Sequence, residues 1–213
     1  MAPNLASLLT LMLVTDDALV AGRDLPGLAR AAERGGATAV QLRLKRASAR
    51  ELSAAARVLC DAVRVPVLVN DRLDVALAAG AAGVHLGPDD LPAELARRIA
   101  PPGFIIGASV GSPEEAAAAR GADYWGVGPW CATGTKADAG DALGPEGFRR
   151  IAALAGGIPC VAIGGVRPED LGRVHAAGAA GVAVVSGILG AEDVETATRR
   201  YAEAWPRGGA ASP

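Results

Sequence analysis

The sequence predicts a (β/α)8 barrel, the TIM-barrel fold, formed by a single domain over residues 1–213. Short apolar runs rich in β-branched residues alternate with Ala/Leu/Arg/Glu-rich stretches of helical period, and eight such pairs can be counted. A length of 213 residues is near the small end of the range for this barrel. We expect the barrel core over about residues 8–204 and a short tail at 205–213. A doubly wound open sheet is the alternative.

Each predicted strand is a short apolar run bounded by polar, glycine or proline residues, and helices fill the intervals. In chain order the strands are Leu11–Thr15, Ala39–Leu44, Val65–Asn70, Gly83–Leu86, Phe104–Ser109, Tyr124–Val127, Pro159–Ile163 and Gly181–Val185. A Gly-Ala pair precedes each even-numbered strand, because glycine is the usual left-handed terminator of the helix before it. These pairs begin at Gly36, Gly80, Gly121 and Gly178. A proline lies close to the start of the third, fifth and seventh strands, at Pro66, Pro102 and Pro159.

The net charge and the number of cysteines limit which partners the protein can bind and in which compartment we expect it. Lys and Arg total 21 and Asp and Glu total 23, so a net charge of −2 provides no basic field for nucleic acid or an anionic membrane. The apolar run Leu5–Val14 is too short to span a bilayer, and we interpret it as a buried first strand. Three cysteines without a close pair favour a reducing compartment, so we expect a cytoplasmic protein. Homo-oligomerisation is left open.

Polar side chains collect where the second predicted strand ends, the edge at which barrels of this kind carry reacting groups. Gln41, Arg43 and Lys45 alternate with Leu42 and Leu44, so the three polar side chains share one face. An ordinary strand end with solvated basic residues is the alternative.

Carboxylates follow the next two strands, with Asp71 after Asn70 and with Asp89 and Asp90 after His85. Each aspartate alone is explained as a helix cap, but hard oxygen ligands on adjacent strand ends together indicate Mg²⁺. We interpret His85 as either a neighbour of the site or a hydrogen-bonded residue of the strand end.

Groups that can donate hydrogen bonds to anionic oxygens also lie at or after the ends of the fifth to eighth predicted strands. The fifth strand ends at Ser109, and the long loop after the sixth strand holds Thr133, Thr135 and Lys136. The seventh and eighth strands end in Gly164-Gly165 and Ser186-Gly187, the usual phosphate position of the fold, although tight turns alone would also explain them. The layout predicts two anion regions that bring two phosphorylated groups together, one of them a metal-bound leaving group.

Seven short segments at these strand ends carry a family signature. They are QLRLK at Gln41–Lys45, NDR at Asn70–Arg72, GVHLGPDDL at Gly83–Leu91, IIGAS at Ile105–Ser109, GVGP with TGTK at Gly126–Lys136, AIGGV at Ala162–Val166 and GVAVVSGIL at Gly181–Leu189. In this order, from about Leu11 to Leu189, the chain resembles the thiamine phosphate synthase family.

The resemblance implies a Mg²⁺-dependent transferase that joins hydroxymethylpyrimidine pyrophosphate to hydroxyethylthiazole phosphate and yields thiamine phosphate and pyrophosphate. Departing pyrophosphate would leave a pyrimidine cation that the thiazole nitrogen captures. By similarity, Asp71 and Asp90 would hold Mg²⁺, and Gln41 would contact the pyrimidine. The pyrophosphate would be held by Arg43, Lys45, Asn70, Ser109 and Lys136, and the thiazole phosphate by Thr133, Thr135, Gly165, Val185 and Ser186. Among these residues we expect Arg43, Lys45, Ser109 and Lys136 to be catalytic, because they face the growing charge of the leaving group.

Two other functions remain as alternatives. A thiazole tautomerase would share the barrel and the phosphate site but lack much of the pyrophosphate set, which is present here. A non-catalytic regulator that binds a phosphorylated ligand would need no metal pair. The chain departs from the family pattern at Cys131 and Ala132, where an aromatic residue and a proline are usual, and Trp130 before them is unusual too. We therefore expect a thiazole pocket of different shape.

Overall fold

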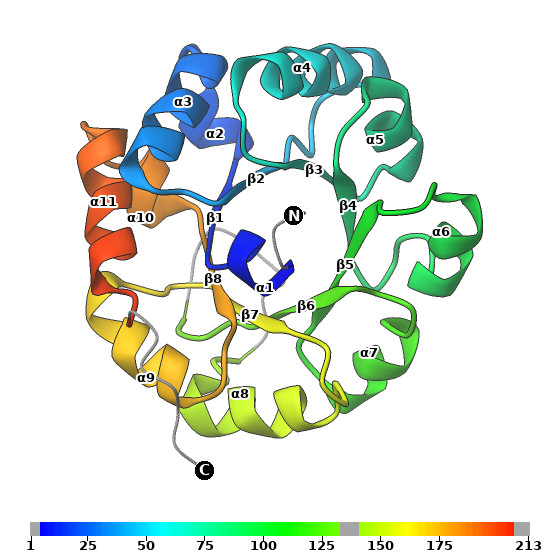
Figure 1. Cartoon of the computed structure of the whole chain (residues 1–213), viewed down its shortest axis with the longest axis vertical. Coiled ribbons are helices and arrows are strands. Elements are labelled where there is room, and N and C mark those ends of the chain that lie inside the picture. The colour runs from blue at the N-terminus through cyan, green and yellow to red at the C-terminus, as the bar shows by residue number, and fades with distance from the viewer. Residues whose placement is uncertain (1–4, 133–140, 207–213) are drawn as a thin grey trace.

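The computed structural model describes residues 5–132 and 141–206, and these form a closed barrel of eight parallel strands in sequential order, β1 to β8 (Figure 1). The strands are β1 Leu11–Val14, β2 Ala39–Leu42, β3 Val67–Asn70, β4 Gly83–Leu86, β5 Ile105–Val110, β6 Tyr124–Val127, β7 Cys160–Ile163 and β8 Gly181–Val184. β1 pairs with both β2 and β8, which closes the ring. The predicted (β/α)8 barrel is therefore confirmed, and the open sheet is excluded.

Most helices surround the barrel on its outside, and α1 lies over one end of it (Figure 1). The helices are α1 Leu5–Leu8, α2 Asp17–Val20, α3 Leu25–Gly35, α4 Ala49–Ala62, α5 Leu73–Ala79, α6 Ala93–Ile99, α7 Pro113–Ala118, α8 Gly144–Ala153, the 3-10 turn η1 Pro168–Asp170, α9 Leu171–Ala176, α10 Ser186–Leu189 and α11 Val194–Ala204. The glycine of each predicted Gly-Ala pair has a positive φ, from 70° at Gly80 to 106° at Gly36, as a left-handed helix terminator requires. In the part of the chain that the structure describes, no helix is long and apolar enough to cross a membrane.

The second strand ends two residues earlier than predicted, at Leu42. The reason lies at Arg43, whose backbone N–H donates to the Thr15 hydroxyl at 2.7 Å, while that hydroxyl donates to the Arg43 carbonyl at 3.0 Å. Both backbone groups of Arg43 are thus satisfied by a side chain, and the chain leaves the sheet. Thr15 is completely buried in this position.

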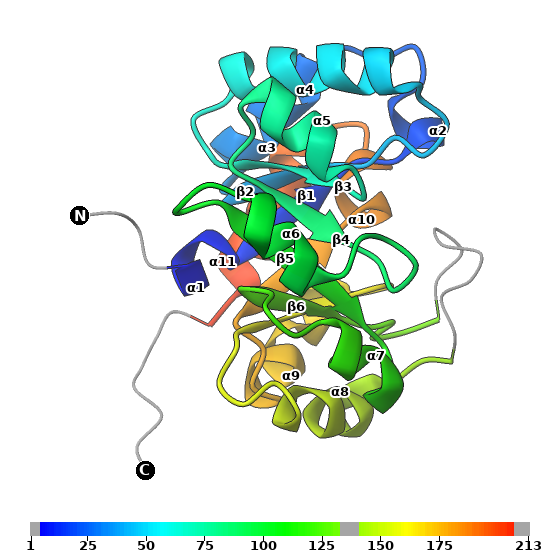
Figure 2. The same ribbon diagram turned by 90° about the vertical axis from the view of Figure 1, so that its right-hand side faces the viewer.

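Two apolar layers form the core. The outer layer lies between the strands and the helices, and the inner layer fills the barrel with side chains such as Met12, Leu68 and Val161. The helix α1 lies over one end of the barrel, where Leu5 and Leu9 pack onto the inner layer (Figure 1). Figure 2 shows α1 at one end and α2 and α10 at the other, which is the carboxyl end of the strands. The apolar filling closes the first end and leaves the carboxyl end for polar side chains.

Candidate active site

A cavity of about 350 Å³ opens at the carboxyl ends of the strands, and all eight strands or the residues just after them line it. It brings together most of the residues that the sequence predicted for the site. The predicted residues that line it are Gln41, Arg43, Lys45, Asn70, Asp71, Ser109, Gly165, Val185 and Ser186. Asp90 is not part of the lining, but its carboxylate accepts the backbone N–H of Gly87, which is part of it. Thr133, Thr135 and Lys136 lie outside the described residues.

The end of β2 presents its basic side chains to the cavity, as the alternation predicted. Gln41 is buried inside the barrel, whereas Leu42 belongs to the outer apolar layer and Leu44 packs against that layer. Arg43 and Lys45 follow the strand and line the cavity.

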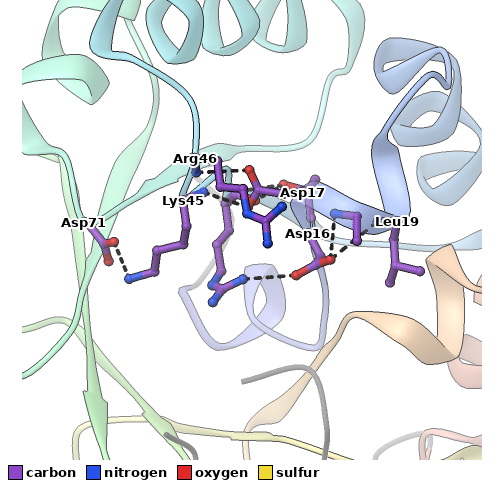
Figure 3. A network of polar contacts seen from close by, with 9 residues as sticks. Asp16, Asp17, Leu19, Lys45, Arg46 and Asp71 are labelled. Carbon is purple, nitrogen blue, oxygen red and sulfur yellow. Dashed lines mark hydrogen bonds and ion pairs between the residues drawn. The ribbon is translucent and has the colours of Figure 1, made fainter. Parts of the chain in front are cut away.

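Two aspartates at the start of α2, the N-cap Asp16 and the first helical residue Asp17, fix these basic residues (Figure 3). The Asp16 carboxylate lies 3.3 Å from the Arg43 guanidinium and also accepts hydrogen bonds from the first turn of α2. Asp17 accepts the backbone N–H groups of Lys45 and Arg46 at 2.8 and 3.1 Å. Neither aspartate was predicted from the sequence, because they come 27 to 29 residues before their partners and only the β1–β2 pairing brings them close.

The two carboxylates predicted to hold a metal lie side by side. The Asp71 carboxylate is 2.7 Å from the Lys45 ammonium, and the Asp90 carboxylate accepts the backbone N–H of Gly87 at 2.7 Å. Burial, and then the neighbouring Asp71 carboxylate, raise the pKa of Asp90. Neither aspartate is the N-cap of the helix that follows it, since Arg72 and Pro92 hold those positions. The helix-cap explanation is therefore wrong for both.

The backbone at Asp71 has an unusual conformation. Its φ is 66°, and among the described residues it is the non-glycine residue with a positive φ. Such conformations concentrate at functional sites, where the surrounding structure holds them. Here the backbone N–H of Asp71 donates to the His85 carbonyl at 2.8 Å, which fixes the turn beside Asp90.

This pair of carboxylates fits a Mg²⁺ ion. Besides burial, the Asp71 carboxylate raises the pKa of Asp90, because a second negative charge close by is unfavourable, and a divalent cation between the two carboxylates would relieve this. The position of the Lys45 ammonium shows that the Asp71 oxygens are accessible to a cation. Among the described residues no cluster of three or more His, Cys, Asp or Glu side chains could hold a metal. Mg²⁺ typically takes one or two protein carboxylates and completes its shell with water and phosphate oxygens.

Two further residues of the barrel interior were not among the predicted site residues. His85 lines the cavity and lies 3.0 Å from the Ser109 hydroxyl, so both interpretations of His85 hold at once. Tyr124 lies deeper and is hydrogen-bonded to His85 at 2.8 Å. In the sequence, Tyr124 looks like an ordinary apolar residue of a strand. Its hydroxyl group, on a side chain that points into the barrel, is the feature that could have indicated a place near the site.

The ends of β7 and β8 form the opposite wall of the cavity, from Gly164, Gly165, Val185 and Ser186. Gly165 has a φ of 66°, and a β-carbon there would lie 2.9 Å from the β-carbon of Cys131. The glycine thus serves both a left-handed turn and a close approach of two loops. This wall carries no charged side chain and consists mainly of backbone and small residues.

The unusual Trp130 does not line the cavity. It is 2% exposed and packs edge-on against Phe148 of α8, with ring centroids 5.9 Å apart. Cys131 is partly buried and packs against the same outer layer. Trp130 is therefore part of the core, whereas Cys131 lies against Gly165 of the cavity wall, so the expectation of a different thiazole pocket stays a prediction.

Comparisons with known proteins identify the family of the chain. The family model of thiamine monophosphate synthase matches residues 11–188. The thiamine-phosphate synthase of Methanospirillum hungatei is 49% identical over 198 residues, which are 91% of this chain and 96% of that protein. The enzyme of Methanoculleus marisnigri is 51% identical over 194 residues, 89% of this chain and 92% of its own.

A solved structure adds the comparison in three dimensions. The thiamine phosphate pyrophosphorylase from Pyrococcus furiosus has a TM-score of 0.84 and 42% identity, and covers 94% of this chain and 97% of its own. The family match extends over far more than half of the residues and includes every strand. The chain therefore belongs to the thiamine monophosphate synthase family.

Proposed function

We propose that the protein is a Mg²⁺-dependent thiamine-phosphate synthase, which transfers the pyrimidinylmethyl group from pyrophosphate to the nitrogen of a thiazole phosphate. One observation carries the proposal: a single cavity has a wall with Arg43, Lys45 and Asp71, beside which Asp90 lies, and, opposite, an uncharged wall of small residues. Two phosphorylated substrates bound at these walls would place their reacting ends toward one another. The relatives that match this chain over most of their length are thiamine-phosphate synthases.

The basic wall would hold the pyrophosphate. Arg43 and Lys45 supply positive charge, and Asn70 and Ser109 supply neutral donors to the same side of the cavity. Lys136 is proposed as a further cation from the loop after β6. These groups gain interaction energy as negative charge grows on the departing pyrophosphate, so they favour the transition state over the ground state.

Asp71 and Asp90 would hold the Mg²⁺. When bound, the ion would supply Lewis-acid stabilisation of the charge on the pyrophosphate oxygens. Lys45 contacts Asp71 at 2.7 Å in the structure and would have to share that carboxylate with the ion. The positive charge of Lys45 therefore offsets the negative charge of Asp71 before the ion and the substrate bind.

The wall of small residues would receive the thiazole phosphate. Gly165, Val185 and Ser186 line it, and backbone N–H groups can approach a phosphate closely where side chains are small. Thr133 and Thr135 are proposed as additional hydroxyl donors. Because this wall carries no lysine or arginine, it suits a monophosphate better than a pyrophosphate with its metal.

The reaction needs no protein nucleophile. The bond between the pyrimidine methylene carbon and the bridging oxygen breaks, and its electron pair leaves with the pyrophosphate. The lone pair of the thiazole nitrogen then forms the new carbon–nitrogen bond and gives the thiazolium product. The contribution of the protein is to position the two substrates and to stabilise the leaving charge.

We also propose a cytoplasmic location, because Cys60, Cys131 and Cys160 are all free thiols. The activity is tested by mixing both substrates with the purified protein and measuring thiamine phosphate and pyrophosphate, with Mg²⁺ and with a chelator. Formation of both products only with Mg²⁺ is expected. A protein that binds or isomerises the thiazole phosphate without releasing pyrophosphate would contradict the proposal.

A matched pair of arginine variants sharpens the test. Arg43→Ala removes a cation from the cavity, whereas Arg72→Ala removes an arginine that also follows a strand but pairs with Asp74 outside the cavity lining. The first variant should lose about 10²-fold in rate, and the second should retain the wild-type rate.

A further inference from the structure

Three side chains from three strands form a chain of hydrogen bonds inside the barrel. The Tyr124 hydroxyl lies 2.8 Å from His85 Nδ1, and His85 Nε2 lies 3.0 Å from the Ser109 hydroxyl oxygen. Ser109 at one end of the chain lines the cavity, whereas Tyr124 at the other end is 1% exposed and does not line it. Tyr124 can therefore act on a ligand only through its neighbours.

The neighbouring strand leaves room for Tyr124. Gly107 of β5 is the register partner of Tyr124, and a β-carbon on Gly107 would collide with the tyrosine ring. The ring fills the space that a side chain on Gly107 would take, so its hydroxyl is held in one place under His85. The tilted contact of the two rings, 5.5 Å between centroids, fixes their relative orientation further.

The contacts assign a direction to the protons. Burial raises the pKa of Tyr124, so the buried hydroxyl keeps its hydrogen, and a buried O–H group needs an acceptor. Among the described residues, His85 Nδ1 lies within hydrogen-bond distance of that hydroxyl, at 2.8 Å, so the hydrogen of Tyr124 is directed to His85 Nδ1. A doubly protonated ring would instead point a donor at that hydrogen.

We propose that Tyr124 is a positioning residue whose hydroxyl holds His85 in the Nε2–H tautomer, so that His85 directs the Ser109 hydroxyl hydrogen into the cavity. With Nδ1 accepting, the ring proton lies on Nε2 and donates to the Ser109 oxygen. The hydrogen of Ser109 is then available to an anionic oxygen. The opposite order would present the lone pairs of Ser109 to the anion and repel it. The proposal rests on the proposed function only in assigning Ser109 to the pyrophosphate.

The tautomer can be measured directly, because the chain has two histidines and the second, His175, is exposed on α9. We would record ¹⁵N spectra of histidine-labelled protein without substrate. We expect His85 with a protonated Nε2 and an unprotonated Nδ1 in the wild type, and a mixture of tautomers in Tyr124→Phe. Tyr201→Phe removes the other tyrosine hydroxyl of the chain, which donates to the Val166 carbonyl, and should leave the His85 signals unchanged. A proton on Nδ1 or on both nitrogens in the wild type, or an unchanged spectrum of Tyr124→Phe, would overturn the proposal.

A double-mutant cycle tests the connection to the ligand. We would measure binding of pyrophosphate with Mg²⁺ to the wild type, Tyr124→Phe, Ser109→Ala and the double variant. Each single change should weaken binding by up to about tenfold, the size of one hydrogen bond, and the double variant should bind no more weakly than Ser109→Ala alone.

The outcomes separate the two proposals. Losses that multiply in the double variant would mean that Tyr124 does not act through Ser109 and would overturn the inference. An unchanged affinity of Ser109→Ala, together with the expected histidine tautomer, would instead reject the assignment of Ser109 to the pyrophosphate and support the direction of the protons.

Discussion

Asp71 combines a strained backbone with a proposed metal-binding side chain, so substitutions there should separate stability from activity. Its φ of 66° lies in the left-handed region, where a residue with a β-carbon is disfavoured by about 1–2 kcal/mol and glycine is not. Glycine loses about 0.5–1 kcal/mol of this advantage through the greater freedom of the unfolded chain. Asp71→Gly should therefore be more stable than Asp71→Ala by roughly 1 kcal/mol, or about 2–4 °C in Tm for a chain of this length.

Asp90 provides the matched control, because its φ is not positive and its side chain belongs to the same carboxylate pair. There the order should reverse, and Asp90→Ala should be more stable than Asp90→Gly by about 0.5–1 kcal/mol. Urea unfolding of the four variants without metal measures both differences. The same order of stability at both positions would refute the account of the Asp71 backbone.

The rates of the same variants should fall regardless of stability. Each variant removes one of the two proposed Mg²⁺ ligands, so each should lose about 10²-fold or more in pyrophosphate release at saturating Mg²⁺. Asp71→Gly is the most informative of them, since we expect it to be well folded and inactive. A variant that keeps more than about a tenth of the wild-type rate would contradict the metal assignment, because that loss is smaller than one electrostatic group contributes.

Three more expectations concern other parts of the molecule. Ser186→Asp should weaken binding of the thiazole phosphate far more than that of the pyrimidine pyrophosphate, and Arg43→Ala should do the reverse; calorimetric titrations that show equal effects on both ligands would defeat the division of the cavity into two walls. Trp130→Ala should lower the free energy of unfolding by about 3–5 kcal/mol in a urea titration, because it empties a buried site against Phe148; a change below about 1 kcal/mol would place the indole outside the core. Burial raises the pKa of Cys160 to about 11, so alkylation of this thiol in the folded protein should be slow at pH 8 and should accelerate as the pH rises toward that value; fast labelling at pH 8, followed by mass spectrometry, would contradict its buried position.

The strands could be predicted because a parallel barrel buries both faces of each strand, which leaves eight short apolar runs in the sequence. The polar residues at their ends could be predicted because inward and outward side chains alternate and because the carboxyl ends of parallel strands meet. Gln41, Asn70 and Ser109 satisfy both conditions, and all three line the cavity.

Contacts between distant loops could not be predicted in this way. Nothing in the sequence around Asp17 indicates that it accepts the backbone N–H of Lys45, because that contact depends on the pairing of β1 with β2. The position of Tyr124 depends likewise on the space that Gly107 leaves on another strand. The place of the Trp130 ring, against Phe148 in the outer layer, also depends on a residue from another part of the chain.

The central claim is that a metal held by Asp71 and Asp90 joins the basic wall to the pyrophosphate, while the opposite wall binds its phosphate without metal. Titration of the purified protein with pyrophosphate, and separately with a thiazole phosphate, tests this claim most directly when each is done with Mg²⁺ and with a chelator. We predict that chelation weakens pyrophosphate binding by at least about 10²-fold, that it leaves thiazole phosphate binding unchanged, and that Asp71→Asn reproduces the first effect in the presence of Mg²⁺. Pyrophosphate binding of equal strength with and without Mg²⁺ would contradict the claim.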